Sequence, residues 1–185
     1  MTRTLVLGGA RSGKSAHAER LARQSGKDVV YIATAGAGDA EMAHRIALHR
    51  ADRPAHWSTV EEPLALAGVL AAWRAPHRLV LVDCLTLWLS NLLFAGGTQY
   101  PDVGTIELPA RFHDERAALL AQLANDVGDV VLVSNEVGMG IVPYGAVTRA
   151  FADEAGRLNQ AVAALCDNVV FVAAGLPLAL KGAAC

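Results

Sequence analysis

Short, uninterrupted apolar segments recur along this chain and constrain its fold more than any other feature. Five of them, rich in valine and leucine, lie at residues 4–7, 29–33, 79–82, 130–134 and 169–173. Their residues do not alternate between apolar and polar, which is typical of strands buried on both faces of a parallel sheet. Two weaker candidates, residues 57–60 and 176–180, are predicted to be strands at the edges of that sheet.

Longer stretches with helical spacing separate the strands, at residues 13–24, 39–53, 63–74, 85–94, 109–126 and 151–165. This alternation predicts an α/β fold in which helices flank a mostly parallel central sheet. Residues 95–104 contain three glycines and a proline and form the clearest loop. Because no repeat or linker divides the 185 residues, we expect one domain, residues 1–185.

The composition excludes several classes of protein. With 53% hydrophobic and 18% charged residues the chain is not intrinsically disordered, and a net charge of −2 gives no support for nucleic-acid binding. Cys84, Cys166 and Cys185 are odd in number and show no C-x-x-C spacing, which fits free thiols in a reducing cytoplasm. The most apolar stretch, residues 84–97, is too short to span a bilayer. We therefore expect a soluble cytoplasmic protein without a membrane span.

The most specific motif directly follows the first predicted strand. It consists of Gly8, Gly9, Ala10, Arg11, Ser12, Gly13, Lys14 and Ser15. It matches G-x-x-x-x-G-K-[ST] between a strand and a helix, the context that identifies a phosphate-binding loop. Backbone N–H groups of such a loop surround phosphate oxygens, Lys14 reaches the β- and γ-phosphates, and the Ser15 hydroxyl ligates Mg²⁺.

A carboxylate at the end of another buried strand complements this loop. Asp83 directly follows the predicted strand at residues 79–82. In that position its carboxylate holds Mg²⁺ or the water around it. The alternative is that Asp83 caps the helix predicted at residues 85–94, and both roles are compatible.

A stripe of basic residues lies on the helix predicted at residues 39–53. Arg45, His49 and Arg53 recur at i, i+4 spacing and share one helical face. A neutral imidazole can attack phosphorus, and neighbouring arginines favour the neutral form. The stripe is therefore either a polyanion site with a nucleophile or simply a solvated face stabilised by i, i+4 pairs.

Polar residues also follow other strands, where α/β sheets bind their ligands. Ala33, Thr34 and Ala35 end the second strand, and Asn135 and Glu136 follow the strand at residues 130–134. For Asn135 and Glu136 a role in the site and a role in turn formation remain equally open.

The motifs together resemble one enzyme family. They are GGARSGKS at 8–15, YIATA at 31–35, EMAHRIALHRADR at 41–53, WSTVEEP at 57–63, VDCLTLWLSNLL at 82–93, SNEVGMGIVP at 134–143 and RAFADEAGRLNQ at 149–160. In this order they resemble the bifunctional adenosylcobinamide kinase/adenosylcobinamide-phosphate guanylyltransferases of cobalamin biosynthesis. The match covers nearly the whole chain.

The resemblance implies two reactions. The γ-phosphate of ATP or GTP passes to the hydroxyl of the aminopropanol arm of adenosylcobinamide. GTP then guanylylates a histidine, which corresponds to His49, and adenosylcobinamide phosphate takes the GMP to give adenosylcobinamide-GDP.

The resemblance also implies a site, a fold and an assembly. The nucleotide contacts carried over are the loop at 8–15, Ala33, Thr34, Ala35, Arg50, Ala51, Asp52, Arg53, Glu61 and Asp83. Lys14 and His49 would be catalytic, and Ser15 and Asp83 would hold Mg²⁺. The implied fold is RecA-like, with an antiparallel edge strand, in a homotrimer.

Two alternatives stay open on the sequence alone. One is a P-loop small-molecule kinase without a covalent step, and the other is a nucleotide-binding regulatory module. The corrinoid-binding residues are not recognisable, although Trp88, Tyr144 and residues 176–180 are candidates because they are apolar.

Overall fold

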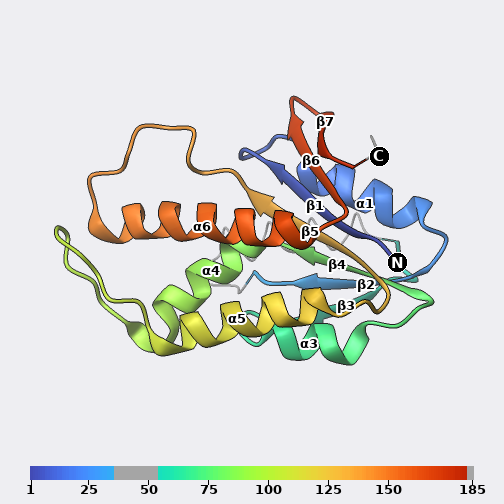
Figure 1. Ribbon diagram of the computed structural model, residues 1–185, viewed down its shortest axis with the longest axis horizontal. Helices are drawn as coiled ribbons and strands as arrows, with labels where there is room; N and C mark the ends of the chain where they lie inside the picture. Colours follow the sequence, from blue (N-terminus) through green and yellow to red (C-terminus); the bar gives the residue numbers. More distant parts are fainter. Residues whose placement is uncertain (36–53, 183–185) are drawn as a thin grey trace.

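A seven-stranded sheet organises the molecule (Figure 1). The computed structural model describes residues 1–35 and 54–182. The strands are β1 (Arg3–Gly8), β2 (Asp28–Ala33), β3 (Ser58–Glu61), β4 (Arg78–Asp83), β5 (Asp129–Asn135), β6 (Asn168–Ala173) and β7 (Leu176–Lys181). Their order is β3-β2-β4-β5-β1-β6-β7. All neighbours pair in parallel except β6 and β7, which form an antiparallel hairpin at one edge.

Helices cover both faces of the sheet. They are α1 (Lys14–Gln24), α3 (Leu66–Trp73), α4 (Leu85–Phe94), α5 (Ala110–Ala124) and α6 (Ala146–Leu165), with a 3-10 turn at Ala95–Gly97. Leu5 of β1 packs in the core with α3 to α6, whereas the next residue, Val6, packs on the other face with Ala18 and Ala22 of α1. The strands β1, β2, β4, β5 and β6 thus have apolar residues on both sides, which explains why their apolar runs do not alternate.

The predicted sheet is confirmed, including both weak edge strands, and so are the helices predicted within the described residues, but two helix starts differ. α3 begins at Leu66 rather than 63, because the Glu62 carboxylate accepts hydrogen bonds from Leu64 N and Ala65 N and forms a turn there. α6 begins at Ala146 rather than 151. Its first turn is fixed by a tertiary hydrogen bond from Ala146 N to Asp102 O, which no local pattern reveals. The helix predicted at residues 39–53 lies outside the described residues.

Candidate nucleotide site

The phosphate loop connects β1 to α1 at the carboxyl edge of the sheet. Arg11 and Gly13 adopt left-handed backbone angles, with φ of 55° and 93°. The loop folds back on itself, because Ser12 N donates to Gly9 O at 3.3 Å and Lys14 Nζ donates to the same oxygen at 3.2 Å. Lys14 thus lies across the loop, where an ammonium group meets the phosphates of a bound nucleotide.

Close packing explains two glycines of the motif. A Cβ on Gly8 would lie 2.4 Å from Ser12 Oγ and 2.5 Å from Val172 O. A Cβ on Gly13 would lie 3.1 Å from the Cα of Gly175, and Gly175 N donates to Ser12 O at 2.8 Å. The phosphate loop therefore rests on the turn of the β6–β7 hairpin, so the antiparallel edge strand helps to shape the site.

Asp83 ends β4 on the same edge of the sheet. It is half-buried, and the Tyr31 hydroxyl donates to its Oδ2 at 3.1 Å. The capping alternative is wrong, because Cys84 is the N-cap of α4 and no side chain caps that helix. β5 lies between β4 and β1, so Asp83 and the phosphate loop flank the end of β5.

The residues at this edge fit Mg²⁺ bound together with a nucleotide. Within residues 1–35 and 54–182, no three His, Cys, Asp or Glu side chains form a group that holds a metal by protein ligands alone. Mg²⁺ binds instead through one or two side chains, waters and substrate phosphates. Ser15 offers a hydroxyl and Asp83 a carboxylate, and both residues are half-buried. These are the one or two oxygen ligands that Mg²⁺ needs from the protein when phosphates and waters supply the rest.

A buried polar contact joins the ends of β2 and β4. Thr34 Oγ1 accepts a hydrogen bond from Cys84 N at 2.8 Å and donates to Cys84 O at 2.7 Å. Asn91 Nδ2 donates to Thr34 O at 2.7 Å. Ala33 pairs with Asp83 on one side and Glu61 on the other, so three predicted nucleotide contacts lie in register at this edge. Asn91 was missed from the sequence, although an amide in an apolar helix is a usable signal.

Asn135 and Glu136 have different roles. Asn135 Nδ2 donates to Thr86 Oγ1 at 2.7 Å, and Asn159 Nδ2 donates to Asn135 O at 3.2 Å, so Asn135 connects β5 to α4 and α6. Glu136 forms a turn, with its Oε1 accepting from Gly138 N at 2.6 Å. Glu136 N also donates to Gly8 O at 3.1 Å, which attaches this turn to the phosphate loop.

Two other side chains near the site are structural. His17 of α1 is buried, and burial, followed by the Arg20 charge, lowers its pKa. Arg20 Nη2 lies 2.5 Å from His17 Nδ1, so the imidazole is a neutral acceptor there. Trp88 is fully buried with its Nε1 donating to Leu64 O at 2.8 Å, so its candidacy as a corrinoid contact is wrong.

Two buried thiols have raised pKa values: Cys84 directly follows Asp83 at the site, whereas Cys166 lies at the opposite end of the sheet. Burial, followed by the Asp83 charge, raises the pKa of Cys84. Burial, followed by the Asp167 charge, raises the pKa of Cys166 to about 12. Both are free thiols.

Five predicted site residues lie outside the described part of the chain: His49, Arg50, Ala51, Asp52 and Arg53.

Residues 4–180 match the model of the cobinamide kinase / cobinamide phosphate guanyltransferase family. The chain belongs to this family. The chain therefore has the two activities of the family, cobinamide kinase and cobinamide phosphate guanyltransferase. The chain is 56% identical over 180 residues to the bifunctional adenosylcobalamin biosynthesis protein CobP of Pseudomonas aeruginosa, covering 97% of this chain and 98% of that protein. It is 45% identical over 179 residues to CobU of Salmonella typhimurium, covering 96% and 98%.

Solved structures confirm the fold at low sequence identity. A prototypical ATPase of a bacterial type III secretion system superposes with a TM-score of 0.53 at 15% identity, covering 96% of this chain and 56% of that one. The ATPase EscN of enteropathogenic E. coli gives 0.52 at 15% identity, covering 94% and 43%. The described helices include none that is long and apolar enough to cross a membrane.

Proposed function

We propose that the phosphate loop and Asp83 bind MgATP or MgGTP and present its γ-phosphate to the hydroxyl of cobinamide. The observation that supports this is the position of Lys14 and Asp83 on either side of the end of β5, at the carboxyl edge where α/β sheets bind ligands. Mg²⁺, held by Ser15 and Asp83, neutralises phosphate charge when it is bound. Phosphoryl transfer depends mainly on positioning and charge neutralisation, which these residues supply.

We propose that Lys14 moves from Gly9 O to the phosphates when nucleotide binds. Its hydrogen bond to Gly9 O satisfies the ammonium group within the loop. Gly8, packed against β6, and Gly13, packed against the β6–β7 turn, keep the loop in shape during this exchange. The hydroxyl oxygen of cobinamide attacks the γ-phosphorus and loses its proton to solvent, the bond to the β–γ bridging oxygen breaks, and ADP or GDP leaves.

For the second reaction we propose a guanylyl-histidine at His49. A nitrogen of the neutral imidazole attacks the α-phosphorus of GTP, the bond to the α–β bridging oxygen breaks, and pyrophosphate leaves. The phosphate oxygen of cobinamide phosphate then attacks the same phosphorus and breaks the P–N bond, which regenerates His49. Family membership and the R-I-x-x-H sequence around His49 support this assignment.

Labelled GTP tests the covalent step without corrinoid. Protein, Mg²⁺ and GTP labelled on the α- or the γ-phosphate are incubated, and protein-bound label is measured after denaturation. Retained α-label that is stable to base, labile to acid and lost in His49→Ala is expected. His56→Ala, which changes an exposed histidine, is the control. Retained γ-label would contradict the guanylyl intermediate, and no label with continued cobinamide phosphorylation would favour the kinase-only alternative.

The predicted homotrimer and cytoplasmic location belong to the same proposal. Sedimentation equilibrium is expected to give the mass of three chains. A monomer or dimer at micromolar concentration would contradict the assembly without affecting the assignment of His49.

A further inference from the structure

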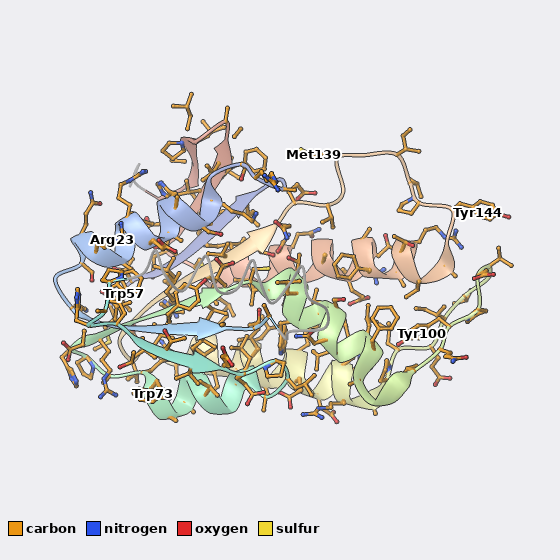
Figure 2. The ribbon with its side chains drawn as sticks, turned by 180° about the vertical axis from the view of Figure 1, so that it is seen from behind. Arg23, Trp57, Trp73, Tyr100, Met139 and Tyr144 are labelled. Atoms are coloured by element: carbon orange, nitrogen blue, oxygen red, sulfur yellow. The ribbon has the colours of Figure 1, made fainter. Side chains whose placement is uncertain are left out.

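The segment that joins β5 to α6 is strongly apolar and contains none of the predicted nucleotide contacts. We call residues 137–145 the apolar arm. Met139, Ile141, Val142 and Tyr144 within it are 79%, 98%, 77% and 84% exposed. Figure 2 shows the arm standing clear of the helices, with Tyr144 near the start of α6. Clustered exposure of large apolar side chains marks a surface that binds a ligand or a partner.

Both ends of the apolar arm are fixed. At the near end Glu136 N donates to Gly8 O at 3.1 Å, so the arm begins beside the phosphate loop. At the far end the Arg149 guanidinium donates to the carbonyls of Tyr144, Pro143 (3.3 Å) and Gly104 (3.4 Å). The arm is therefore held in place before any ligand arrives, which lowers the entropic cost of binding.

The arm offers polar as well as apolar groups. Within the described chain, the peptide groups of residues 139–142 form no hydrogen bond to other residues. Apart from Gly140 and its two chain neighbours, no heavy atom of the described residues lies within 4 Å of where a Gly140 Cβ would be, so a ligand can approach the backbone there. The arm thus exposes N–H and C=O groups without partners among the described residues, as well as apolar side chains.

A cavity of about 570 Å³ opens behind the near end of the arm. Its lining includes Met139 from the arm, Leu7 of β1, Asn159 and Ala163 of α6, and Leu180 of β7. An apolar cavity with a few polar groups is the usual form of a small-molecule site. Here it extends the surface of the arm into the body of the protein.

We propose that the apolar arm is the platform on which the corrin ring of cobinamide binds during phosphorylation. This rests on the kinase reaction proposed above. The corrin ring carries methyl groups and, around its rim, primary amides, which match the apolar side chains and free peptide groups of the arm. Binding there brings the hydroxyl of the ligand to the edge where the phosphate loop holds the γ-phosphate. A second copy of this chain could also cover the apolar side chains. We favour cobinamide because the arm begins beside the phosphate loop, where the substrate of the kinase reaction must lie.

Equilibrium dialysis with cobinamide itself tests the platform independently of catalysis. Full-length protein is saturated with Mg²⁺ and a non-hydrolysable ATP analogue, and the visible absorbance of cobinamide reports binding. The double variant Met139→Ser/Ile141→Ser is expected to raise the Kd for cobinamide about tenfold or more, because two large apolar contacts are lost. The Kd of the nucleotide and the sedimentation mass are expected not to change. Val127→Ser, at an exposed apolar residue on the opposite edge of the sheet, is the control and should leave both Kd values unchanged.

The outcomes separate the platform from the proposed reaction. An unchanged Kd for cobinamide in the double variant, or no binding of cobinamide by the wild type, would overturn the platform. A lower sedimentation mass in the double variant, with Kd values that follow it, would assign the arm to contacts between copies instead. A wild type that binds cobinamide without phosphorylating it would contradict the kinase proposal, while the Kd comparison would still decide the role of the arm.

Discussion

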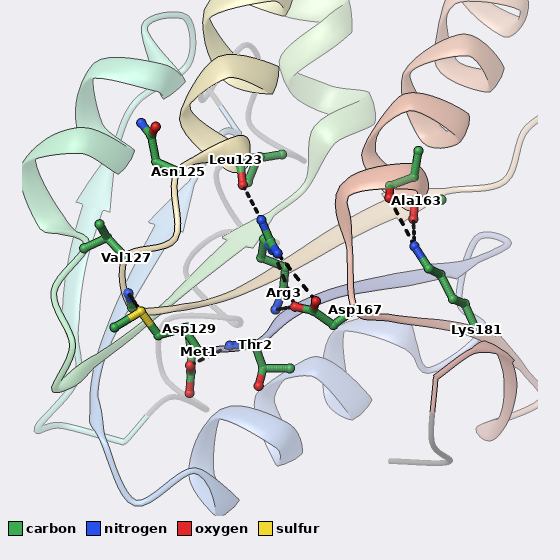
Figure 3. Close-up of polar contacts among 12 residues, drawn as sticks. Met1, Thr2, Arg3, Leu123, Asn125, Val127, Asp129, Ala163, Asp167 and Lys181 are labelled. Carbon is green, nitrogen blue, oxygen red and sulfur yellow. Dashed lines mark hydrogen bonds and ion pairs between the residues drawn. The ribbon is translucent and has the colours of Figure 1, made fainter.

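The parallel strands of the central sheet begin at one side of the molecule, the amino edge, and end at the other, the carboxyl edge. Polar groups are held in different ways at these two edges. At the amino edge, ionic groups pair with each other and with the backbone. Arg3 N donates to Asp167 Oδ2 at 2.8 Å, Arg3 Nη1 donates to Leu123 O at 3.1 Å, and Thr2 N donates to Asp129 Oδ1 at 2.9 Å (Figure 3). Lys27 forms an ion pair with Asp129 at 2.8 Å. These contacts fasten strand starts and helix ends together, so we expect them to contribute stability rather than activity.

At the carboxyl edge, neutral side chains bind the backbone and each other, and the charged side chains form few contacts. Thr34, Asn91 and Asn135 form the fastening contacts, while Lys14 has one hydrogen bond to Gly9 O. Ser12 Oγ, Ser134 Oγ and Asn159 Oδ1 are buried without a partner among the described residues. Buried polar atoms of this kind need a partner, such as a water molecule or a bound ligand. We infer that the charged groups of the amino edge serve stability, whereas those of the carboxyl edge are available for binding.

Removing Lys14, whose ammonium group has a hydrogen bond to Gly9 O, should have the largest effect on activity. Lys14→Ala is expected to lower kcat for cobinamide phosphorylation about 10²–10³-fold, because a charge that neutralises the phosphates is lost. The free energy of unfolding should change by less than about 0.5 kcal/mol, as for other surface substitutions. Steady-state kinetics and urea unfolding provide the two readouts. A destabilised but active Lys14→Ala variant would break the distinction between the edges.

A substitution of Arg74 at the amino edge should lower the stability of the protein and leave its activity nearly unchanged. Arg74 is buried at the end of α3, and its guanidinium donates to the carbonyls of Val127 (2.6 Å), Asn125 (2.8 Å) and Gln122. Arg74→Ala leaves these carbonyls without their donor and should cost about 3 kcal/mol of unfolding free energy. At a temperature where the variant is folded, kcat should stay within about twofold of wild type, because such stability effects do not reach the site. A large loss of kcat with unchanged stability would contradict this assignment.

These edges were not equally predictable from the sequence. The phosphate loop was recognisable because its chemistry requires a local pattern, Gly8 to Ser15, between a strand and a helix. Asp83 was predictable because it directly follows an apolar run. The role of Arg74 was not predictable, because its three acceptors are carbonyls 48 to 53 residues away. Every residue has a backbone carbonyl, so the sequence does not indicate which ones accept hydrogen bonds from a side chain. The same holds for the start of α6, which a contact with Asp102 determines.

A variant at the carboxyl edge tests whether its neutral contacts also matter for stability. Thr34→Val keeps the shape of the side chain but leaves Cys84 N without its acceptor. It also removes one of the two hydrogen bonds that Cys84 O accepts, the other coming from Trp88 N at 3.2 Å. We expect a loss of about 2 kcal/mol in unfolding free energy and a smaller, severalfold loss of kcat, because Thr34 joins the strand that ends at Asp83 to β2. Thr59→Val, at an exposed position of β3, is the control. Unchanged stability in Thr34→Val would mean that these hydrogen bonds contribute nothing net.

The smallest effect should appear only in acid, at the amino edge. Burial by itself would raise the pKa of the Asp129 carboxyl, but hydrogen bonds from Lys27 and Thr2 N, with the nearby positive charges, lower it below the usual 3.8. A carboxyl whose pKa is lowered on folding contributes stability that is present above the unfolded pKa and is lost as the pH falls through the folded pKa. Asp129→Asn should therefore be about 1 kcal/mol less stable than wild type at pH 6, and this difference should shrink toward zero below pH 3.8 in urea unfolding experiments. A difference that stays constant with pH would show that geometry, and not the charge of Asp129, provides the stability of this edge.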